Sequence, residues 1–460
     1  MAQLKNQSKK IAIFGAGITG LSAARELIRL GHEVHVYETL PYVGGLAATF
    51  KDDDGFTYDN GPRFIFSTLA EKLGILEDCV PVKYFEHLHV EGRDYLFPFG
   101  FAYNPRFALS VGLAFLTRYF LPKPVDLGAF LKTYYGPYFS SKTLAPLIEK
   151  WSGVASNEMS IDFASRLLPT NLSYIVHCLV KKIRGGITED YYKKGRYIVY
   201  PKTSNAKIFE ALCETKGLQI SLSSGIRSIE TNNRHVTSVT LESGNSVTAD
   251  YYLSTMPINN LAKQISPHGI LDHWLKLQYR SIVILFIKLN KPKILDGLWT
   301  WFPETKFPFY RIAEYKNAVP GLAPNDKTLI SVEHACQEGD NIWTMNQEEL
   351  FSYIFDDLHQ LYGIKTRDVL GLDINRCAHA YPVLRKETED LQRSLKHTTP
   401  IDNLFLAGRT GMFQYRMTEG SYDSAMDCAS AIEHYINDQP LETNSELFRD
   451  AYGRPLVIHE

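Results

Sequence analysis

Near the N-terminus, three glycines and one acid have the types and spacing of groups that hold phosphate and ribose. These residues are Gly15, Gly17, Gly20 and Glu38. In a G-x-G-x-x-G pattern the first glycine permits a tight turn and the second lets a diphosphate approach the backbone. The third lets a helix pack close to a strand. A carboxylate at Glu38 can accept both hydroxyls of an adenosine ribose and disfavours a 2′-phosphate, which argues against NADP. FAD and NAD both stay open at this point.

The elements around these residues are those that a dinucleotide site needs. The apolar run 11–14 predicts a parallel strand buried on both faces. Apolar residues then recur at helical spacing from Leu21 to Ile28, and 34–37 predicts a second strand that Glu38 closes. The N–H groups and the dipole at the start of the helix would face the phosphates. This complete context argues against a glycine turn without a nucleotide.

The continuation of the chain carries a second glycine pair, Gly44-Gly45, and the stretch Tyr58-Asp59-Asn60-Gly61-Pro62-Arg63-Phe64. Together with the first turn, this order of motifs resembles the superfamily of flavin-containing amine oxidases, protoporphyrinogen oxidases and phytoene desaturases. UDP-galactopyranose mutase shares the FAD domain of that superfamily. The resemblance therefore implies FAD rather than NAD as the cofactor.

Features of this resemblance recur in three separated parts of the sequence. They imply an α/β fold with a Rossmann-type FAD-binding domain (GR2-type) assembled from three segments, 9–66, 196–261 and 395–437. Between these segments we expect a helical insertion at 67–195, part of the substrate domain, and a mixed-sheet substrate-binding domain at 262–394. A C-terminal tail would occupy 438–460.

The resemblance also implies which residues contact FAD. The third segment contains Gly408-Arg409 and then Met417 to Ser421, after which a helix is expected to begin at Gly420-Ser421 and to direct its positive end at the flavin. Arg409 stands where the family often has an acid, which favours the protoporphyrinogen-oxidase-like and mutase-like branches. The expected cofactor-binding residues are Gly15, Ala16, Gly17, Ile18, Thr19, Gly20, Glu38, Gly44, Gly45, Leu46, Gly61, Pro62, Arg63, Ile226, Thr255, Gly408, Arg409, Glu419, Gly420 and Ser421.

Candidate catalytic residues are Arg63, Tyr310 and Arg311. Arg63 follows the turn that the resemblance places near the flavin ring. The Tyr310-Arg311 pair could hold a carboxylate or phosphate through a bidentate guanidinium contact, although purely structural arginines are an equal alternative. Further pocket candidates are Tyr200, Tyr381 and Tyr415. The stretch from Leu147 to Val154, which contains Lys150 and Trp151, resembles the K-x-W signature of the protoporphyrinogen-oxidase-like group, which we interpret as structural.

Composition excludes several classes of function. The formal net charge of the 460-residue chain is −2 and no basic block occurs, so a nucleic-acid partner is not expected. The six cysteines lack C-x-x-C spacing, so we expect no metal site and a reducing, cytoplasmic compartment. The polar N-terminus does not read as a signal peptide.

The apolar stretch 108–121 is too short to span a bilayer and predicts a buried helix, a peripheral membrane contact or a lid. The oligomeric state stays open.

These observations favour an FAD-dependent oxidoreductase that oxidises or desaturates a small organic substrate by hydride transfer to flavin N5. No Ser-His-Asp, H-E-x-x-H or clustered-carboxylate pattern occurs in the sequence, as expected where the cofactor supplies the chemistry. Two alternatives remain open. One is a sugar-nucleotide mutase that uses reduced FAD without net redox change, and the other is a flavin-binding protein without turnover.

Overall fold

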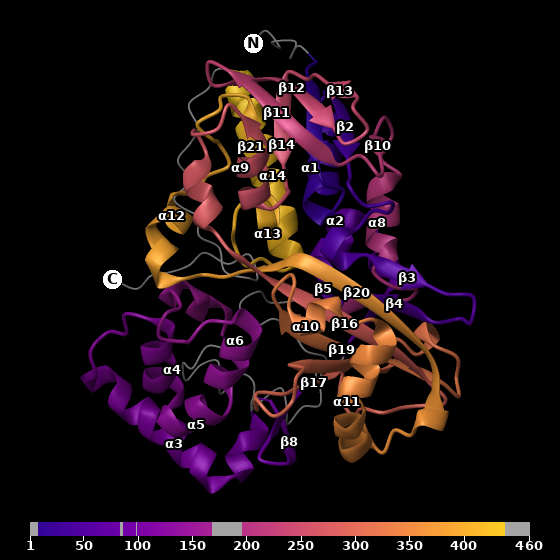
Figure 1. The fold of residues 1–460 in the computed structure, drawn as a ribbon, viewed down its shortest axis with the longest axis vertical. Coiled ribbons are helices and arrows are strands. Elements are labelled where there is room, and N and C mark those ends of the chain that lie inside the picture. Colours follow the sequence, from indigo (N-terminus) through magenta and orange to yellow (C-terminus); the bar gives the residue numbers. More distant parts are fainter. Residues whose placement is uncertain (1–7, 83–85, 98, 168–195, 438–460) are drawn as a thin grey trace. The chain divides into compact units, whose positions relative to one another are not determined.

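The computed structural model describes residues 8–82, 86–97, 99–167 and 196–437, which form two compact units (Figure 1). The first unit comprises the described parts of Met1–Ala48, Ala206–Gln278 and Asp390–Glu460. The second comprises those of Thr49–Asn205 and Tyr279–Glu389. The predicted tail 438–460 and the 168–195 part of the predicted helical insertion lie outside the described residues.

The first unit is built on a parallel sheet of five strands in the order β10-β2-β1-β14-β21. The central strand β1 is apolar and buried from Ile11 to Phe14, as expected for a strand covered on both faces. Phe14 lies beside Tyr37 and Ser254, so β1, β2 and β14 end at the same edge. The strands are β1 Lys10–Phe14, β2 Glu33–Tyr37, β10 Gln219–Ser221, β14 Tyr251–Ser254 and β21 Leu404–Leu406.

Helices and a smaller sheet complete this unit. α1 and α14 pack against each other, and α8 also contacts α1 (Figure 1). The smaller sheet has the strand order β13-β12-β11-β15. Its strands are β11 Ile226–Asn232, β12 His235–Leu241, β13 Ser246–Val247 and β15 Ile265–Ser266. The helices are α1 Ile18–Arg29, α8 Ala206–Cys213, α9 Ile258–Gln264, α12 Glu389–Ser394, α13 Gly408–Gly411 and α14 Thr418–Ile436, with 3-10 turns at Gly45–Ala47 and Asp272–Lys276.

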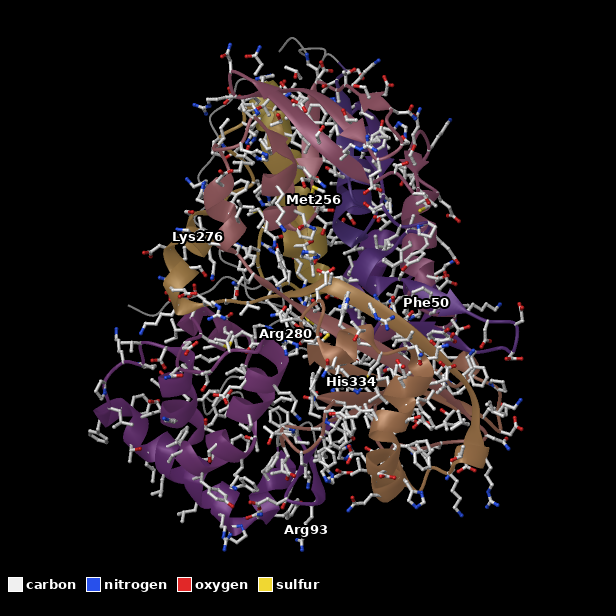
Figure 2. All side chains as sticks on the ribbon, viewed as in Figure 1. Phe50, Arg93, Met256, Lys276, Arg280 and His334 are labelled. Carbon is white, nitrogen blue, oxygen red and sulfur yellow. The ribbon has the colours of Figure 1, made fainter. Side chains whose placement is uncertain are left out.

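The second unit is built on a mixed sheet of seven strands in the order β20-β16-β19-β18-β17-β7-β8. Its neighbours are antiparallel except β17 and β7, which are parallel. Strands β16 and β19 pair over nine residues each. Figure 2 shows one labelled side chain on each strand, Arg280 on β16 and His334 on β19. The strands are β7 Glu86–Val90, β8 Arg93–Leu96, β16 Tyr279–Leu289, β17 Trp299–Trp301, β18 Arg311–Glu314, β19 Thr328–Cys336 and β20 Val369–Pro382.

Helix α11, Gln347–Tyr362, packs its apolar face into the core of this sheet. Its start is fixed by a reciprocal capping box between Asn346 and Glu349, and it ends at Gly363, whose φ is +62°. Leu350, Ile354 and Leu358 are fully buried against β16 and β19 side chains such as Val283. Local capping and the spacing of apolar residues thus agree on the position of this helix.

The other elements of the second unit are short. The helices α3, α4, α5 and α6 form a cluster in which α3, α4 and α5 contact one another and α6 packs against α5 and α4 (Figure 1). The two small sheets contain β3 with β4, and β5, β9 and β6. The bounds are β3 Thr49–Lys51, β4 Thr57–Asp59, β5 Ile65–Phe66, β6 Cys79–Pro81, β9 Ile198–Pro201, α2 Ser67–Leu73, α3 Pro105–Thr117, α4 Leu127–Tyr135, α5 Pro137–Lys142, α6 Leu144–Ser152 and α10 Asn341–Thr344. Single 3-10 turns occupy Leu76–Asp78, Phe99–Tyr103, Arg118–Phe120, Ile161–Arg166, Tyr315–Asn317, Pro320–Leu322, Thr366–Asp368 and Lys386–Thr388.

The predicted α/β fold, with a parallel sheet and a separate mixed sheet, is confirmed. Residues 67–195 are not helical throughout, because β7 and β8 form a hairpin that adds two strands to the edge of the mixed sheet. Contacts also place 49–66 and 196–205 in the second unit and 262–278 in the first. The domain limits drawn from expected cofactor contacts remain a prediction.

Candidate cofactor and substrate site

The turn between β1 and α1 holds three glycines that meet different constraints. Gly15 has a φ of +109°, and a Cβ there would lie 2.3 Å from the Oγ1 of Thr255. A Cβ at Gly20 would lie 1.9 Å from the carbonyl oxygen of Gly15. At Gly17 the closest atom of the described chain, the carbonyl oxygen of Gly44, would be 4.0 Å away. Packing therefore demands glycine at 15 and 20, whereas the space at 17 is open to a ligand.

The second glycine pair lies against this turn. Gly44 and Gly17 form a parallel bridge, and the N–H of Gly44 donates to the carbonyl of Ala16 at 2.9 Å. Gly44 has a φ of +111°, and a Cβ there would lie 2.8 Å from the Cα of Ala48. Gly45 and Leu46 begin the 3-10 turn that follows. The two turns thus present bare backbone at one edge of the sheet, as a diphosphate requires.

The start of α1 carries no compensating side chain of its own. Gly17 is its N-cap and supplies no side-chain hydrogen bond. The first turn, which contains Ile18 and Thr19, has no acidic residue. The first N–H groups of a helix lack intrahelical partners and carry partial positive charge. An anion bound at this end of α1 would accept hydrogen bonds from these N–H groups and balance their positive charge.

Glu38 follows β2 and is nearly buried. Its Oε2 accepts from the N–H of Ala16 at 2.7 Å, and its Oε1 accepts from the N–H of Leu40 at 2.9 Å. A carboxylate has about four acceptor positions, so two remain for the hydroxyls of a ribose. The two backbone N–H groups also fix the carboxylate beside the glycine turn.

The third predicted segment joins the first through close contacts. Gly408 has a φ of +82°, and a Cβ there would lie 2.6 Å from the Oγ1 of Thr19. The N–H of Gly408 donates to the Oγ of Ser424 at 2.9 Å. The hydroxyl of Thr19 donates to the carbonyl of Ser421 at 3.2 Å, across 402 positions of sequence. Tertiary folding therefore brings the first and third segments together.

The helix after this turn begins earlier than predicted. α14 starts at Thr418, because Met417 is the last residue with extended backbone, so Glu419, Gly420 and Ser421 all lie in its first turn. Arg416 is buried, and its Nη1 donates to the carbonyl of Gly420 at 3.0 Å. The guanidinium of Arg409 lies over the ring of Tyr415, 4.1 Å from its centroid.

Ile226 and Thr255 lie at strand ends in the same unit. Ile226 begins β11, and its carbonyl accepts from the Nε2 of Gln264 at 2.8 Å. Thr255 follows β14 and donates from its Oγ1 to the carbonyl of Phe14 at 2.9 Å. Their predicted contacts with adenine and with the dinucleotide remain predictions.

The Gly61-Pro62-Arg63 turn belongs to the second unit and is supported by Asp59. The fully buried Asp59 carboxylate accepts hydrogen bonds from Thr49, Tyr200 and Asn205. Burial raises the pKa of Asp59 to about 6, despite these hydrogen bonds. The carbonyl of Asp59 accepts from the N–H of Gly61 at 2.7 Å, and Asn205 also donates to the carbonyl of Arg63 at 3.2 Å.

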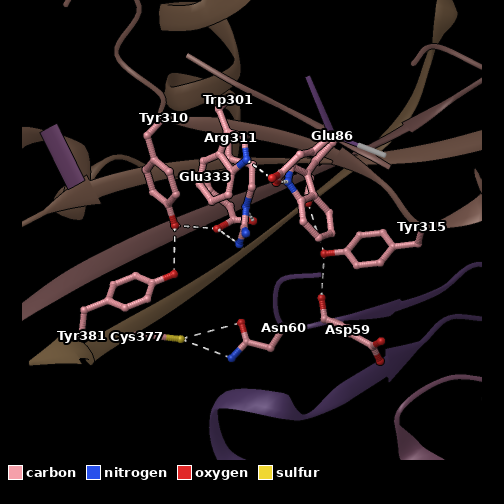
Figure 3. A network of polar contacts seen from close by, with 12 residues as sticks. Asp59, Asn60, Glu86, Trp301, Tyr310, Arg311, Tyr315, Glu333, Cys377 and Tyr381 are labelled. Carbon is pink, nitrogen blue, oxygen red and sulfur yellow. Dashed lines mark hydrogen bonds and ion pairs between the residues drawn. The ribbon is translucent and has the colours of Figure 1, made fainter. Parts of the chain in front are cut away.

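A buried ion pair lies next to this turn (Figure 3). Arg311 forms a bidentate pair with Glu333, with Nε to Oε1 at 2.9 Å and Nη2 to Oε2 at 2.7 Å. The hydroxyl of Tyr310 donates to the same carboxylate at 2.5 Å and lies 3.4 Å from the hydroxyl of Tyr381. A Cβ at Gly61 would lie 3.9 Å from both the Nη2 of Arg311 and the Oε1 of Glu333.

This geometry changes the role that the sequence suggested for Arg311. Its guanidinium group is hydrogen-bonded to Glu333, so a bidentate contact with a substrate anion would have to displace that carboxylate. The side chain also lies over the ring of Trp301, 4.8 Å from its centroid. Burial and the neighbouring Glu333 carboxylate hold the pKa of Tyr310 well above its usual range, so its hydroxyl stays protonated.

Sequence reasoning missed Glu333, and one signal could have found it. Glu333 interrupts the apolar run of β19, and all nine residues of that strand except Ala335 are buried. A fully buried carboxylate needs a cation or several donors, so an arginine on the neighbouring strand was the natural partner. The antiparallel register places Arg311 directly opposite Glu333.

Lys150 secures the loop that leads to Tyr310. Its ammonium donates to the carbonyls of Phe302, Glu304, Phe307 and Phe309, at 2.7, 2.6, 3.1 and 3.2 Å respectively. This agrees with the structural interpretation of the K-x-W signature. The imidazole of His334, on the next strand residue after Glu333, is fully buried, and burial lowers its pKa to about 4.

The parallel sheet, the paired glycine turns and the ribose-side carboxylate define a dinucleotide-binding protein of the α/β class. The chain belongs to the flavin-containing amine oxidoreductase family, whose model matches residues 18–433. It is therefore a flavoprotein, and its cofactor is FAD. The open space over Gly17 and the two spare acceptor positions of Glu38 fit the diphosphate and ribose of this cofactor.

Curated relatives align with only part of the chain. A probable zeta-carotene desaturase of Synechococcus elongatus is 33% identical over 109 residues, which is 21% of this chain and 22% of the relative. A 4,4'-diapophytoene desaturase of Staphylococcus haemolyticus is 40% identical over 84 residues, 17% of each chain. The chain thus spans about a fifth of the length of these relatives.

Solved structures match over almost the whole chain. A reduced UDP-galactopyranose mutase superposes with a TM-score of 0.76 at 22% identity and covers 94% of both chains. A putative protoporphyrinogen oxidase from Exiguobacterium sp. 255-15 gives a TM-score of 0.72 at 19% identity, covering 93% of this chain and 99% of the other. At these identities the likeness establishes the fold alone.

Proposed function

We propose that this chain is an FAD-dependent oxidoreductase that oxidises or desaturates a small organic substrate, in the manner of protoporphyrinogen oxidases and carotenoid desaturases. When bound, FAD would accept a hydride at its N5 atom. The observation that carries the proposal is the Arg311–Glu333 pair beside the Gly61 turn, in which the carboxylate neutralises the guanidinium and the guanidinium lies over the ring of Trp301. A guanidinium neutralised in this way favours an uncharged or lipophilic substrate over a diphosphate.

The chain's own residues would bind and orient the two reactants. The backbone of Gly15 to Gly20 and of Gly44-Gly45 would hold the diphosphate, and Glu38 would hold the ribose. We infer that Gly61 to Arg63, Arg409 and the first turn of α14 flank the flavin ring, and that Ile226 and Thr255 border the dinucleotide. Tyr310 and Tyr381 would offer hydroxyl groups to the substrate, with Glu333 fixing the orientation of Tyr310.

The runner-up is a sugar-nucleotide mutase, favoured by the strong fold match to a mutase over nearly the full chain. In that case Arg63 or a rearranged Arg311 would face the substrate diphosphate. Anaerobic mixing distinguishes the two candidates. An oxidoreductase should lose its flavin absorption band at about 450 nm when given protoporphyrinogen or an acyclic carotene.

A mutase would instead convert UDP-galactopyranose only after dithionite reduction, with no net change in the flavin band. If the holoprotein responds to none of these substrates, the chain is a flavin-binding protein without turnover, and the proposed activity is wrong.

Cofactor binding is tested separately with Gly17→Ala. Because the added Cβ would come no closer than 4.0 Å to the Gly44 carbonyl oxygen, its nearest neighbour apart from the adjoining residues, the variant should fold. It should nevertheless retain FAD at least about tenfold more weakly, since the methyl group occupies the diphosphate position. Glu38→Ala should act similarly, and Glu33→Ala, at the exposed start of β2, is the control. Undiminished FAD retention in both Gly17→Ala and Glu38→Ala would overturn the proposed cofactor site.

A further inference from the structure

The segment around α3 exposes an unusual concentration of large apolar side chains. Fourteen large hydrophobic residues are exposed among the described residues, and eight of them lie between positions 103 and 125. Two are almost fully exposed, Phe120 at 88% and Tyr103 at 82%. We call the eight residues the α3 surface: Tyr103, Leu109, Leu113, Leu116, Tyr119, Phe120, Leu121 and Val125. Such a concentration of exposed apolar side chains within one short segment indicates an interaction site.

The exposure follows from how α3 packs in its unit. Phe107, Ser110 and Ala114 are buried, and α3 contacts α4 and α5. Leu109, Leu113 and Leu116 recur at spacings of four and three, so they form a row on another face of the same helix. The sequence stretch is therefore not a buried helix, although it is apolar almost all round.

The charges in this segment are of one sign. Residues 97–125 contain Arg106, Arg118 and Lys123 and no Asp or Glu. Arg118 also lies over the rings of Phe115 and Tyr119, at 4.5 and 4.9 Å from their centroids, next to exposed Phe120. Leucines flanked by tyrosines and basic side chains match the boundary between acyl chains and anionic headgroups.

The geometry points to this surface as a docking site for an anionic lipid bilayer. None of the helices among the described residues has the length and apolarity to cross a membrane, so α3 would lie in the plane of the interface. The combination of exposed leucines and tyrosines with basic side chains, and with no acidic residue over 29 positions, is the feature that selects an anionic lipid surface.

The test measures co-sedimentation of the full-length holoprotein with phosphatidylcholine vesicles that contain or lack phosphatidylglycerol. Binding should require the anionic lipid and weaken as salt is raised. Leu116→Ser with Phe120→Ser should lower partitioning at least about tenfold, because both side chains would lose their apolar contact. Arg106→Glu with Lys123→Glu should lower it about fivefold per residue on anionic vesicles.

The matched control is Tyr353→Ser with Leu370→Ser, which removes two exposed apolar side chains elsewhere in the same unit. This control should bind like the unmodified chain, and flavin absorbance should be unchanged in all variants. Three outcomes would overturn the proposal: no binding to anionic vesicles, equal binding by the Leu116/Phe120 variant, or self-association that this variant abolishes. The last outcome would show that a second copy of the chain covers the surface.

Discussion

At the residue scale, the second unit compensates the buried carboxylates of Glu333 and Asp59 in different ways. Glu333 faces a guanidinium and a tyrosine hydroxyl. Asp59 accepts its hydrogen bonds from neutral donors, on Thr49, Tyr200 and Asn205. A neutral donor stabilises a buried negative charge less than a cation does, so the two residues should respond differently to substitution and to pH.

We expect Glu333→Gln to destabilise the protein by about 3–5 kcal/mol, because it leaves the Arg311 guanidinium buried without its charge partner. Urea unfolding of the apoprotein measures the change. Glu333→Gln combined with Arg311→Met should recover much of the loss, since neither charge then remains. Glu26→Gln, which breaks an exposed pair with Arg29, is the control and should have a far smaller effect. A double variant as unstable as the sum of both single variants would contradict this prediction.

Asp59 should make stability depend on pH between about 4 and 6. Its folded pKa of about 6 lies above the value of 3.8 that it has when solvated, so the folded state favours the protonated form. Its stabilising contribution is complete below pH 3.8 and is lost as pH rises through 6. The difference corresponds to about 3 kcal/mol.

This dependence is measured as the slope of unfolding free energy against pH, in the unmodified chain and in Asp59→Asn. The isosteric amide does not titrate, so the stability of Asp59→Asn should fall less between pH 4 and 6. Parallel slopes in the two proteins would show that Asp59 is not the titrating group.

At the scale of elements, close approach decides which glycines are structural. The first turn of α1 crosses the end of β1 so closely that Gly20 has no room for a Cβ, whereas Gly112 on α3 faces open space. Neither glycine has a positive φ, so the two differ in packing and not in backbone conformation. The sequence motif marks Gly20 and gives no indication about Gly112.

We therefore expect opposite results from two glycine-to-alanine substitutions. Gly20→Ala should destabilise the apoprotein by roughly 2 kcal/mol or more, because its Cβ would overlap the carbonyl oxygen of Gly15. Gly112→Ala should stabilise it by about 0.5–1 kcal/mol through lower backbone entropy in the unfolded chain. Thermal unfolding of both apoproteins provides the comparison. Equal effects at the two positions would mean that the α1–β1 contact is looser than the structure indicates.

At the scale of the whole molecule, the parallel sheet and its glycine turns are assembled from three distant stretches of chain. β1 lies between β2 and β14, and β21 follows β14 at the edge. The binding groups come together only when this sheet forms, so the cofactor should bind the folded chain and not the unfolded one. Ligand binding then adds to the stability of the fold.

FAD at a hundred times its dissociation constant should add about 2.7 kcal/mol to the stability of the apoprotein. ADP should also raise the melting temperature, because the proposed contacts of Gly17 and Glu38 are with the adenosine diphosphate half of the cofactor. Riboflavin should raise it less. Differential scanning fluorimetry with each ligand tests this, and Gly17→Ala should lose the response to ADP. Stabilisation by riboflavin without stabilisation by ADP would contradict the assignment of the glycine turns.

The sequence by itself determined the dinucleotide half of this protein. Gly15, Gly17, Gly20 and Glu38 lie within a single strand–turn–helix–strand unit, so their chemistry follows from local spacing. The start of α14 was predicted two residues late, because Thr418 and Glu419 suit both a turn and a first helical turn. The family resemblance supplied the order of the three segments, and contacts between Thr19, Gly408 and Ser421 join two of them.

Only the tertiary structure decided which group Arg311 contacts and whether the apolar helix α3 is buried or exposed. Arg311 could bind a substrate anion or a protein carboxylate. Which of the two it binds depends on Glu333, which lies 22 positions further along the sequence and is placed opposite Arg311 by the strand register. The apolar stretch around α3 likewise fits a buried or an exposed helix. Periodicity shows which residues share a face, but burial depends on the neighbours that cover that face, and these come from distant parts of the chain.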